Sequence, residues 1–137
     1  MSKIIVASGY FDPLHVGHLE YLNRSKKLGD TLMVIVNSDH QAKLKKGQSF
    51  MPENERLQII RSLSCVDSAV IAVDKDKTVC ETLRSIRPYL FTNGGDQNNQ
   101  SIPEKKICDE LGIKLEDGLG DKIQSSSWLL KGIKKIL

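Results

Sequence analysis

The sequence predicts an α/β protein of the Rossmann-like, doubly wound type, in which helices cover both faces of a parallel sheet. Two observations lead to this fold class. Short β-branched, apolar runs alternate with amphipathic segments along the chain. The runs are also apolar almost throughout, which is typical of parallel strands that are buried on both faces. Right-handed crossovers through the intervening helices then complete the expected topology.

The first strand is expected over 3–8, where a β-branched run ends at Gly9, a residue that permits a sharp exit. A helix over 17–28 begins after the loop closed by Pro13, and an apolar run gives the second strand over 31–37. A lysine-rich loop is expected next. The later elements continue the alternation: helix 53–63, strand 68–73, helix 78–86, strand 88–92, helix 103–110, a short strand over 113–115 and a final helix over 126–136.

Length and composition predict a single domain over 1–137, because 137 residues with 39% hydrophobic content build one core. No apolar run reaches the roughly eighteen residues of a membrane span, so no membrane partner is expected. The three cysteines are scattered, which favours free thiols and a cytoplasmic location. With 20 basic and 17 acidic residues the net charge is +3, so nucleic acid is not an expected partner.

Phosphate chemistry is indicated by the segment from Gly9 to His18, which leaves the first strand and opens a helix. Free N–H groups and the positive end of the helix dipole form an anion site there, and Gly17 lets a phosphate approach the backbone. His15 and His18 can converge on the same phosphate. Each imidazole can donate a hydrogen bond, and we expect the protonated form to stabilise charge on phosphorus.

A zinc site and a purely structural pair are the alternatives for these two histidines. Zinc needs further ligands, and the only other histidine is His40. Cys65, Cys80 and Cys108 are widely separated and form no Cys-x-x-Cys pair. We therefore expect no metal site formed by the protein itself.

The order of motifs resembles that of the cytidylyltransferase-like nucleotidyltransferases, with their glycerol-3-phosphate cytidylyltransferase and ADP-heptose branches. In that family a phosphate or phosphonate oxygen of a small acceptor attacks the α-phosphorus of CTP or ATP, and pyrophosphate leaves. The resemblance implies catalytic roles for His15 and His18. It rests on His15-Val16-Gly17-His18 together with Phe11-Asp12, Tyr21-Leu22, Lys26, Leu28-Gly29-Asp30, the strand Leu32 to Val36 and Asn37-Ser38-Asp39.

By motif position, further residues acquire expected roles from the same resemblance. Asp12 stands where the family has an acidic residue facing the acceptor. The family also places a lysine and an arginine against the phosphates, and Lys46 and Arg56 match best, with Lys43 as a competitor and Lys45 expected to face water. The expected nucleotide-binding residues are Gly9, Tyr10, Phe11, Gly17, His18 and Lys43.

Two later segments complete the expected site. In Thr92-Asn93-Gly94-Gly95-Asp96 the glycines let the backbone approach a flat base, and Gly94, Gly95 and Asp96 are expected to bind the nucleotide. Ser125 and Ser126 precede the last helix, where the family binds the β- and γ-phosphates. The family arginine before that helix is missing, and Lys122 is a possible substitute.

The sequence thus favours a cytidylyltransferase that moves CMP from CTP to a small phosphorylated acceptor, such as a polyol, sugar or amino-alcohol phosphate. An adenylyltransferase of the ADP-heptose type that uses ATP is the alternative, and a nucleotide-binding module without turnover is a third hypothesis. Mg²⁺ is expected to be bound through the nucleotide phosphates. The family also implies a homodimer, because Cys65-Val66-Asp67 keeps half of an interface signature.

Overall fold

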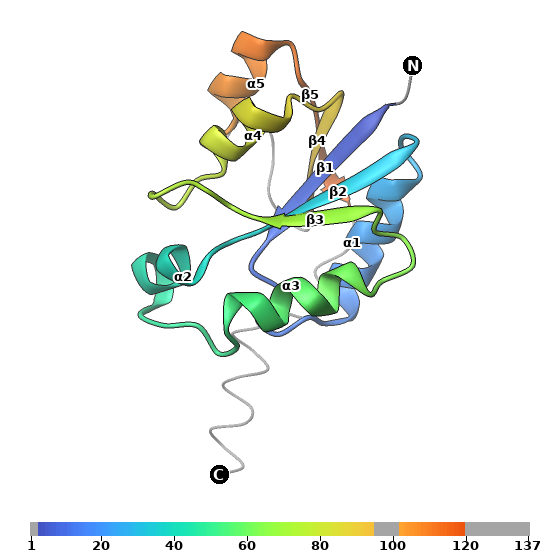
Figure 1. Ribbon diagram of the computed structural model, residues 1–137. Coiled ribbons are helices and arrows are strands. Elements are labelled where there is room, and N and C mark those ends of the chain that lie inside the picture. Colours follow the sequence, from blue (N-terminus) through green and yellow to red (C-terminus); the bar gives the residue numbers. More distant parts are fainter. Residues whose placement is uncertain (1–2, 95–101, 120–137) are drawn as a thin grey trace.

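A computed structural model describes residues 3–94 and 102–119, and these form a parallel sheet in the order β3-β2-β1-β4-β5 (Figure 1). The strands are β1 (Ile4–Gly9), β2 (Thr31–Val36), β3 (Ser68–Ile71), β4 (Leu90–Gly94) and β5 (Lys114–Leu119). The chain winds outward from β1 to β3 and then returns to place β4 on the other side of β1. The predicted doubly wound, Rossmann-like fold is therefore confirmed.

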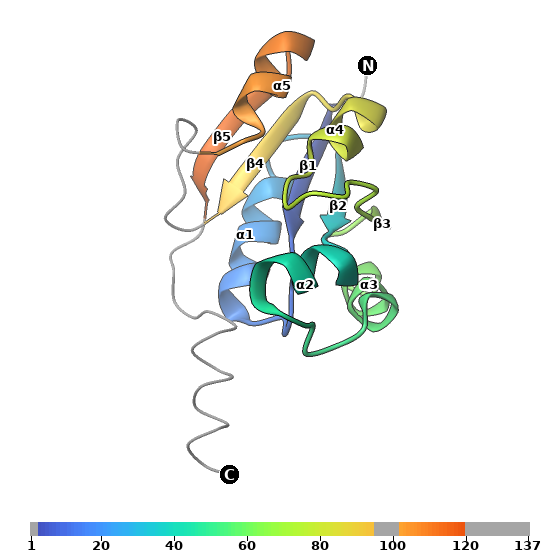
Figure 2. The same ribbon diagram turned by 90° about the vertical axis from the view of Figure 1, so that its left-hand side faces the viewer.

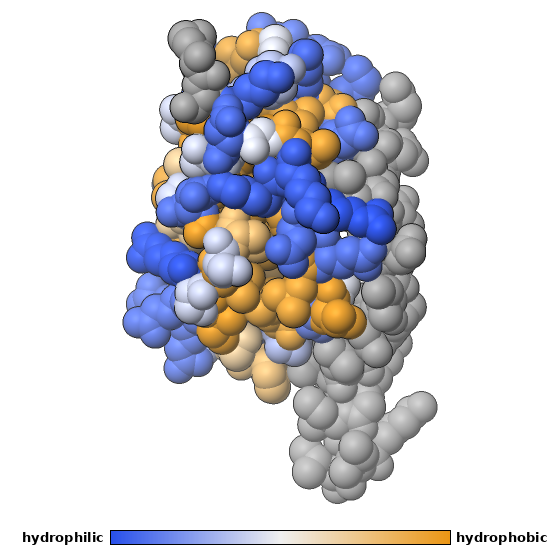
Figure 3. Space-filling view, turned by 90° about the vertical axis from the view of Figure 1, so that its right-hand side faces the viewer, coloured by the Kyte–Doolittle hydropathy of each residue, from blue (hydrophilic) through white to orange (hydrophobic). Residues whose placement is uncertain are grey.

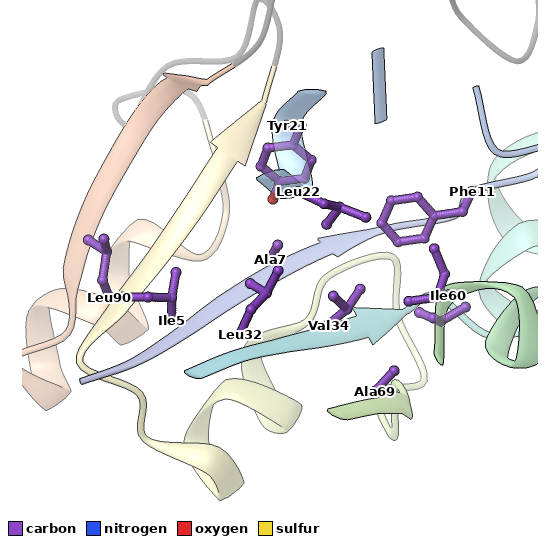
Figure 4. Close-up of a cluster of buried hydrophobic side chains, with 11 residues drawn as sticks. Ile5, Ala7, Phe11, Tyr21, Leu22, Leu32, Val34, Ile60, Ala69 and Leu90 are labelled. Carbon is purple, nitrogen blue, oxygen red and sulfur yellow. The ribbon is translucent and has the colours of Figure 1, made fainter. Parts of the chain in front are cut away.

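Helices cover both faces of this sheet, as predicted. They are α1 (Val16–Lys26), α2 (Asp39–Lys46), α3 (Glu53–Arg61), α4 (Cys80–Ile86) and α5 (Lys105–Leu111). Alternate strand residues point to opposite faces, so Ile5 and Val34 pack with residues of α1 and α3. Val6 and Ile35 pack with residues of α4 and α5 instead. Figure 4 shows the first of these two clusters, with Leu22 from α1 and Ile60 from α3 directed at the strands.

The two cores explain why these segments adopt their structure. β1 and β2 are central strands whose buried side chains are mostly Ile, Val and Leu, so both faces of each strand are covered. Gly29 lies before β2, where a Cβ would stand 2.6 Å from the Ile5 side chain. The close packing of the α1–β2 connection against β1 thus requires a glycine at this position.

Helix α2 was not predicted from the sequence, and the expected lysine-rich loop was wrong. Only Gln41 and Ala42 of this helix are buried, so it carries almost no hydrophobic stripe. Its start does carry a signal, because Ser38 and Gln41 form a capping box at the amino end of α2. The strand predicted over 113–115 is also longer, extending to Leu119. The predicted helix over 126–136 lies outside the described residues.

The carboxyl ends of β1 and β2 point toward α2, which lies beyond them (Figure 2). The topological switch point falls between β1 and β4, where a doubly wound sheet binds its ligands. No helix among the described residues is long and apolar enough to cross a membrane. The face in Figure 3 is mixed, with polar bands across smaller apolar patches.

Candidate functional site

The two histidines of the first motif lie together at the start of α1. His15 is the residue before the helix and His18 is in its first turn. Their rings stack with centroids 3.7 Å apart and an interplanar angle of 20°. The predicted convergence of the two imidazoles is therefore present, at a helix N-terminus that also offers free backbone N–H groups.

A hydrogen bond fixes the tautomer of His18. The backbone N–H of His15 donates to His18 Nδ1 over 3.2 Å, so Nδ1 is the acceptor and the neutral ring carries its proton on Nε2. Burial, and then the neighbouring His15, lower the pKa of His18 to about 3. Burial also lowers the pKa of His15. In the free protein His18 is therefore a neutral hydrogen-bond donor at pH 7, and not the protonated imidazole expected from the sequence.

Phe11 packs against the His18 ring and helps to fix its position. It has a left-handed backbone with φ of 52°, only 2% of its surface is exposed, and its ring meets His18 edge-on with centroids 5.0 Å apart. A Cβ at Gly9 would stand 2.9 Å from this ring, so the glycine makes room for it. Gly9 and Phe11 thus shape the site through packing, and their direct contact with a nucleotide stays a prediction.

Asp12 connects the first motif to α2 and the loop after it. The carboxyl group is fully buried and accepts hydrogen bonds from Lys46 Nζ at 2.7 Å, the Phe50 N–H at 2.8 Å and the Met51 N–H at 2.7 Å. Burial raises the pKa of Asp12, but these three donors outweigh it and hold the pKa below its usual value. The carboxylate is therefore ionised and pairs with Lys46. Its predicted contact with the acceptor stays a prediction.

Ammonium groups gather over the Tyr10 ring. Lys45 Nζ lies 4.6 Å and Lys46 Nζ 5.7 Å from the ring centroid. Burial lowers the pKa of Lys45, and the charges of Lys46 and Lys77 lower it further. Like charges held this close favour the binding of an anion. Lys45 is exposed, as expected from the sequence, and so are Lys43, Lys46 and Lys77. Sequence reasoning missed that Lys45 lies over Tyr10 and that the charge of Lys77 acts on it.

Arg56 is fully buried and is satisfied by protein groups. It donates to the carbonyls of Met51, Tyr10 and Asn37 at 2.9, 2.9 and 2.6 Å, and to Asp39 Oδ1 at 2.8 Å. These partners come from the loop after β1, the end of β2, the start of α2 and the loop before α3. In this arrangement Arg56 exposes no surface to a ligand, so it holds the segments of the site together.

Gln41 fixes α2 in place. Its fully buried side chain accepts hydrogen bonds from Asn37 Nδ2 and the Ser38 N–H, at 3.0 and 2.9 Å. It donates to the carbonyls of Asp76 and Thr78, at 2.9 and 2.7 Å. All four hydrogen-bonding positions of the amide are therefore used, and the helix that carries the lysines is tied to the loop after β3.

At the end of β4 a tyrosine interrupts the sheet. β1 and β4 pair only as far as Val6 and Phe91. One step further, the Ser8 N–H donates to the Tyr21 hydroxyl over 3.2 Å, and that hydroxyl donates to the Thr92 carbonyl over 2.7 Å. Figure 4 shows Tyr21 reaching from α1 toward the strands. Its hydroxyl therefore replaces the direct ladder bond between Ser8 and Thr92.

The structure thus brings most of the predicted residues to one end of the sheet, with Gly94 as the last residue of β4. Within residues 3–94 and 102–119, no group of three or more His, Cys, Asp or Glu side chains is placed to hold a metal ion. Four predicted nucleotide-binding residues lie outside the described residues: Gly95, Asp96, Ser125 and Ser126.

Comparison with known proteins places this geometry among nucleotide-transferring enzymes. A family model described as cytidylyltransferase-like matches residues 6–117. The bifunctional protein HldE of Syntrophotalea carbinolica is 36% identical over 115 residues, which cover 82% of this chain. Those residues are 23% of the relative, so the chain spans about a quarter of that protein.

Two further relatives match nearly end to end. The FAD synthase of Methanocorpusculum labreanum is 36% identical over 134 residues, which cover 93% of each chain. The crystal structure of the lipopolysaccharide core biosynthesis protein from Thermoplasma volcanium is 31% identical, with a TM-score of 0.75, and the match covers 88% of this chain and 98% of that one.

Proposed function

The chain belongs to the cytidylyltransferase-like family of nucleotidyltransferases, and on that premise we propose that it transfers AMP from ATP to a small phosphorylated acceptor. The observation that carries the proposal is the stacked histidine pair at the start of α1, 3.7 Å between ring centroids, in which the neutral His18 ring carries its proton on Nε2. A lysine pair over Tyr10, in the loop that follows β1, supplies positive charge at the same end of the sheet.

ATP replaces the CTP that the sequence favoured because of the relatives. FAD contains an adenylyl group, and FAD synthase is the name of relatives that this chain matches over 93% and 95% of their length. HldE proteins are a second group of relatives.

In the proposed reaction a phosphate oxygen of the acceptor attacks the α-phosphorus of ATP. The bond from that phosphorus to the bridging oxygen breaks, and pyrophosphate leaves with the electron pair. His18 donates a hydrogen bond from Nε2–H to the α-phosphate in the transition state. The stacked His15 ring restricts the orientation of the His18 ring. Lys45 and Lys46 offset the charge of the leaving pyrophosphate. Mg²⁺ would arrive with the nucleotide and neutralise phosphate charge.

FMN is the first acceptor to test, because joining AMP to FMN makes FAD. A sugar phosphate is the second, supported by the likeness to HldE and to the lipopolysaccharide core protein. Both acceptors present a terminal phosphate, so the same attack geometry serves either one. The acceptor therefore has to be decided by product analysis.

The test incubates the protein and Mg²⁺ with ATP or CTP labelled at the α-phosphate, with FMN or with a heptose or glycerol phosphate. We expect label from ATP in a new diphosphate-linked product, with pyrophosphate released in equal amount. Transfer from CTP alone would replace the adenylyl proposal with the cytidylyl one. If neither nucleotide reacts with any acceptor but both bind in calorimetry, the module without turnover becomes the better hypothesis.

A further inference from the structure

Asn93 lies at the switch point of the sheet and leaves the donor of its side-chain amide unused. The residue is only 6% exposed, yet its Nδ2 is buried without a hydrogen-bond partner among the described residues. A buried donor left unpaired loses its hydrogen bonds to water without replacement, so native structures rarely keep one without a reason. Asn93 was part of the fourth-strand motif but received no role from the sequence.

The local strand geometry makes this amide available to a ligand. The Tyr21 hydroxyl stands between Ser8 and Thr92, so β1 and β4 do not pair beyond Phe91. Thr92 Oγ1 lies 2.9 Å from Ser25 Oγ on α1, which directs the Thr92 side chain to the α1 face. Because side chains alternate along a strand, Asn93 points to the opposite face, on the side of Phe91.

We propose that Asn93 is a nucleotide-binding residue whose Nδ2–H donates to an acceptor atom of the nucleoside. The histidines, which would bind the α-phosphate, lie at the start of α1 on the other face of the sheet. Asn93 is therefore placed to contact the ribose or the base instead. A carboxamide offers a donor and an acceptor side by side, a pattern that complements the edge of adenine. This inference rests on the proposed function.

The test measures ATP binding by calorimetry for the wild-type protein and for Asn93→Leu, Asn93→Asp and Asn23→Leu. Leucine and aspartate keep the approximate size of asparagine but remove the Nδ2 donor. Asn23 provides the matched control, because it is exposed on α1 and, among the residues that the structure describes, donates only to the Leu19 carbonyl of its own helix. We expect both Asn93 variants to bind ATP at least about tenfold more weakly, and the control to bind it normally.

Two further readouts separate ligand binding from a structural role. Since Nδ2 has no partner to lose, removing this buried donor should not destabilise the fold, and Asn93→Leu should unfold at the same or a higher urea concentration than the wild type. Inorganic triphosphate, which lacks the nucleoside, should bind all variants equally. Binding of ATP by Asn93→Leu within threefold of the wild type would overturn the inference while leaving the proposed function intact, and so would a parallel loss of triphosphate binding. If wild-type protein binds no ATP, the proposed function itself fails and takes this inference with it.

Discussion

Replacing Arg56 with methionine should lower the stability of the folded protein, and not only its activity. The guanidinium is fully buried and donates four hydrogen bonds to three carbonyls and the Asp39 carboxylate. Methionine keeps most of the aliphatic stem but leaves these acceptors without their donor. By motif position Arg56 was expected to contact the phosphates, so this variant decides between two explanations for the same residue.

The expected cost follows from the burial of the guanidinium and the number of its partners. Removing one member of a buried, hydrogen-bonded charge network typically costs 3–5 kcal/mol, so we expect Arg56→Met to lose about 3 kcal/mol or more. Asp39 is 44% exposed, and water can solvate it after the loss, which keeps the estimate at the lower end. Arg84→Met is the matched control. Arg84 is 49% exposed and lies 3.8 Å from Glu81, so its loss should cost less than about 0.5 kcal/mol.

The assay is equilibrium urea unfolding of the wild type and both variants, followed by transfer kinetics under conditions where each remains folded. Arg56→Lys should be intermediate, because an ammonium has three donors and lacks the planar fork. The reasoning would be refuted if Arg56→Met unfolded within about 0.5 kcal/mol of the wild type while transfer fell more than 100-fold. That result would assign Arg56 to direct contact with the substrate.

Three other perturbations follow from the same structure. His18 has a pKa of about 3 when folded and an ordinary value near 6.5 when unfolded, so only the unfolded chain gains a proton on this ring as the pH falls between these values. Between pH 7 and pH 4 the free energy of unfolding of the wild type should therefore fall about 3 kcal/mol more than that of His18→Asn. Equal falls of the two proteins, measured by urea unfolding at each pH, would contradict a lowered pKa for His18. Tyr21→Phe removes the hydroxyl that joins Ser8 and Thr92 and should cost about 2 kcal/mol in the same assay, with a loss under 0.5 kcal/mol counting against the bridge. Asp12→Asn removes a buried charge that accepts hydrogen bonds from three donors, and it should lower the free energy of unfolding by about 2 kcal/mol or more. A variant as stable as the wild type would disprove the connecting role of Asp12.

Much of the fold follows from local sequence signals. The β-branched runs of β1 and β2 predict central strands, since only a position covered on both faces tolerates so continuous an apolar segment. Helix α2 could not be predicted from a hydrophobic stripe, because only Gln41 and Ala42 of this helix are buried. This helix is held by hydrogen bonds of Gln41 instead, and its one local signal was the Ser38 capping box.

The site was predictable as a location but only partly as a set of contacts. Parallel strands bring their carboxyl ends together, so the loops after β1, β2 and β4 had to meet. The burial of Arg56 could not be read from the sequence, because its acceptors lie 5 to 46 residues away along the chain. An arginine in the first turns of a helix is ordinarily exposed, and only the assembled fold reveals the four acceptors around it.

The measurement that tests the account most directly is the initial rate of acceptor-dependent pyrophosphate release from ATP by wild-type protein, His18→Ala and His40→Ala. His40 is exposed and lies 3.1 Å from the Lys75 carbonyl, away from the stacked pair, so it controls for the loss of an imidazole. The account predicts a wild-type rate that requires the acceptor, an unchanged rate for His40→Ala, and a fall of roughly 100-fold or more for His18→Ala with its fold intact. A His18→Ala rate within about tenfold of the wild type would contradict the central claim that the His18 donor stabilises the transition state.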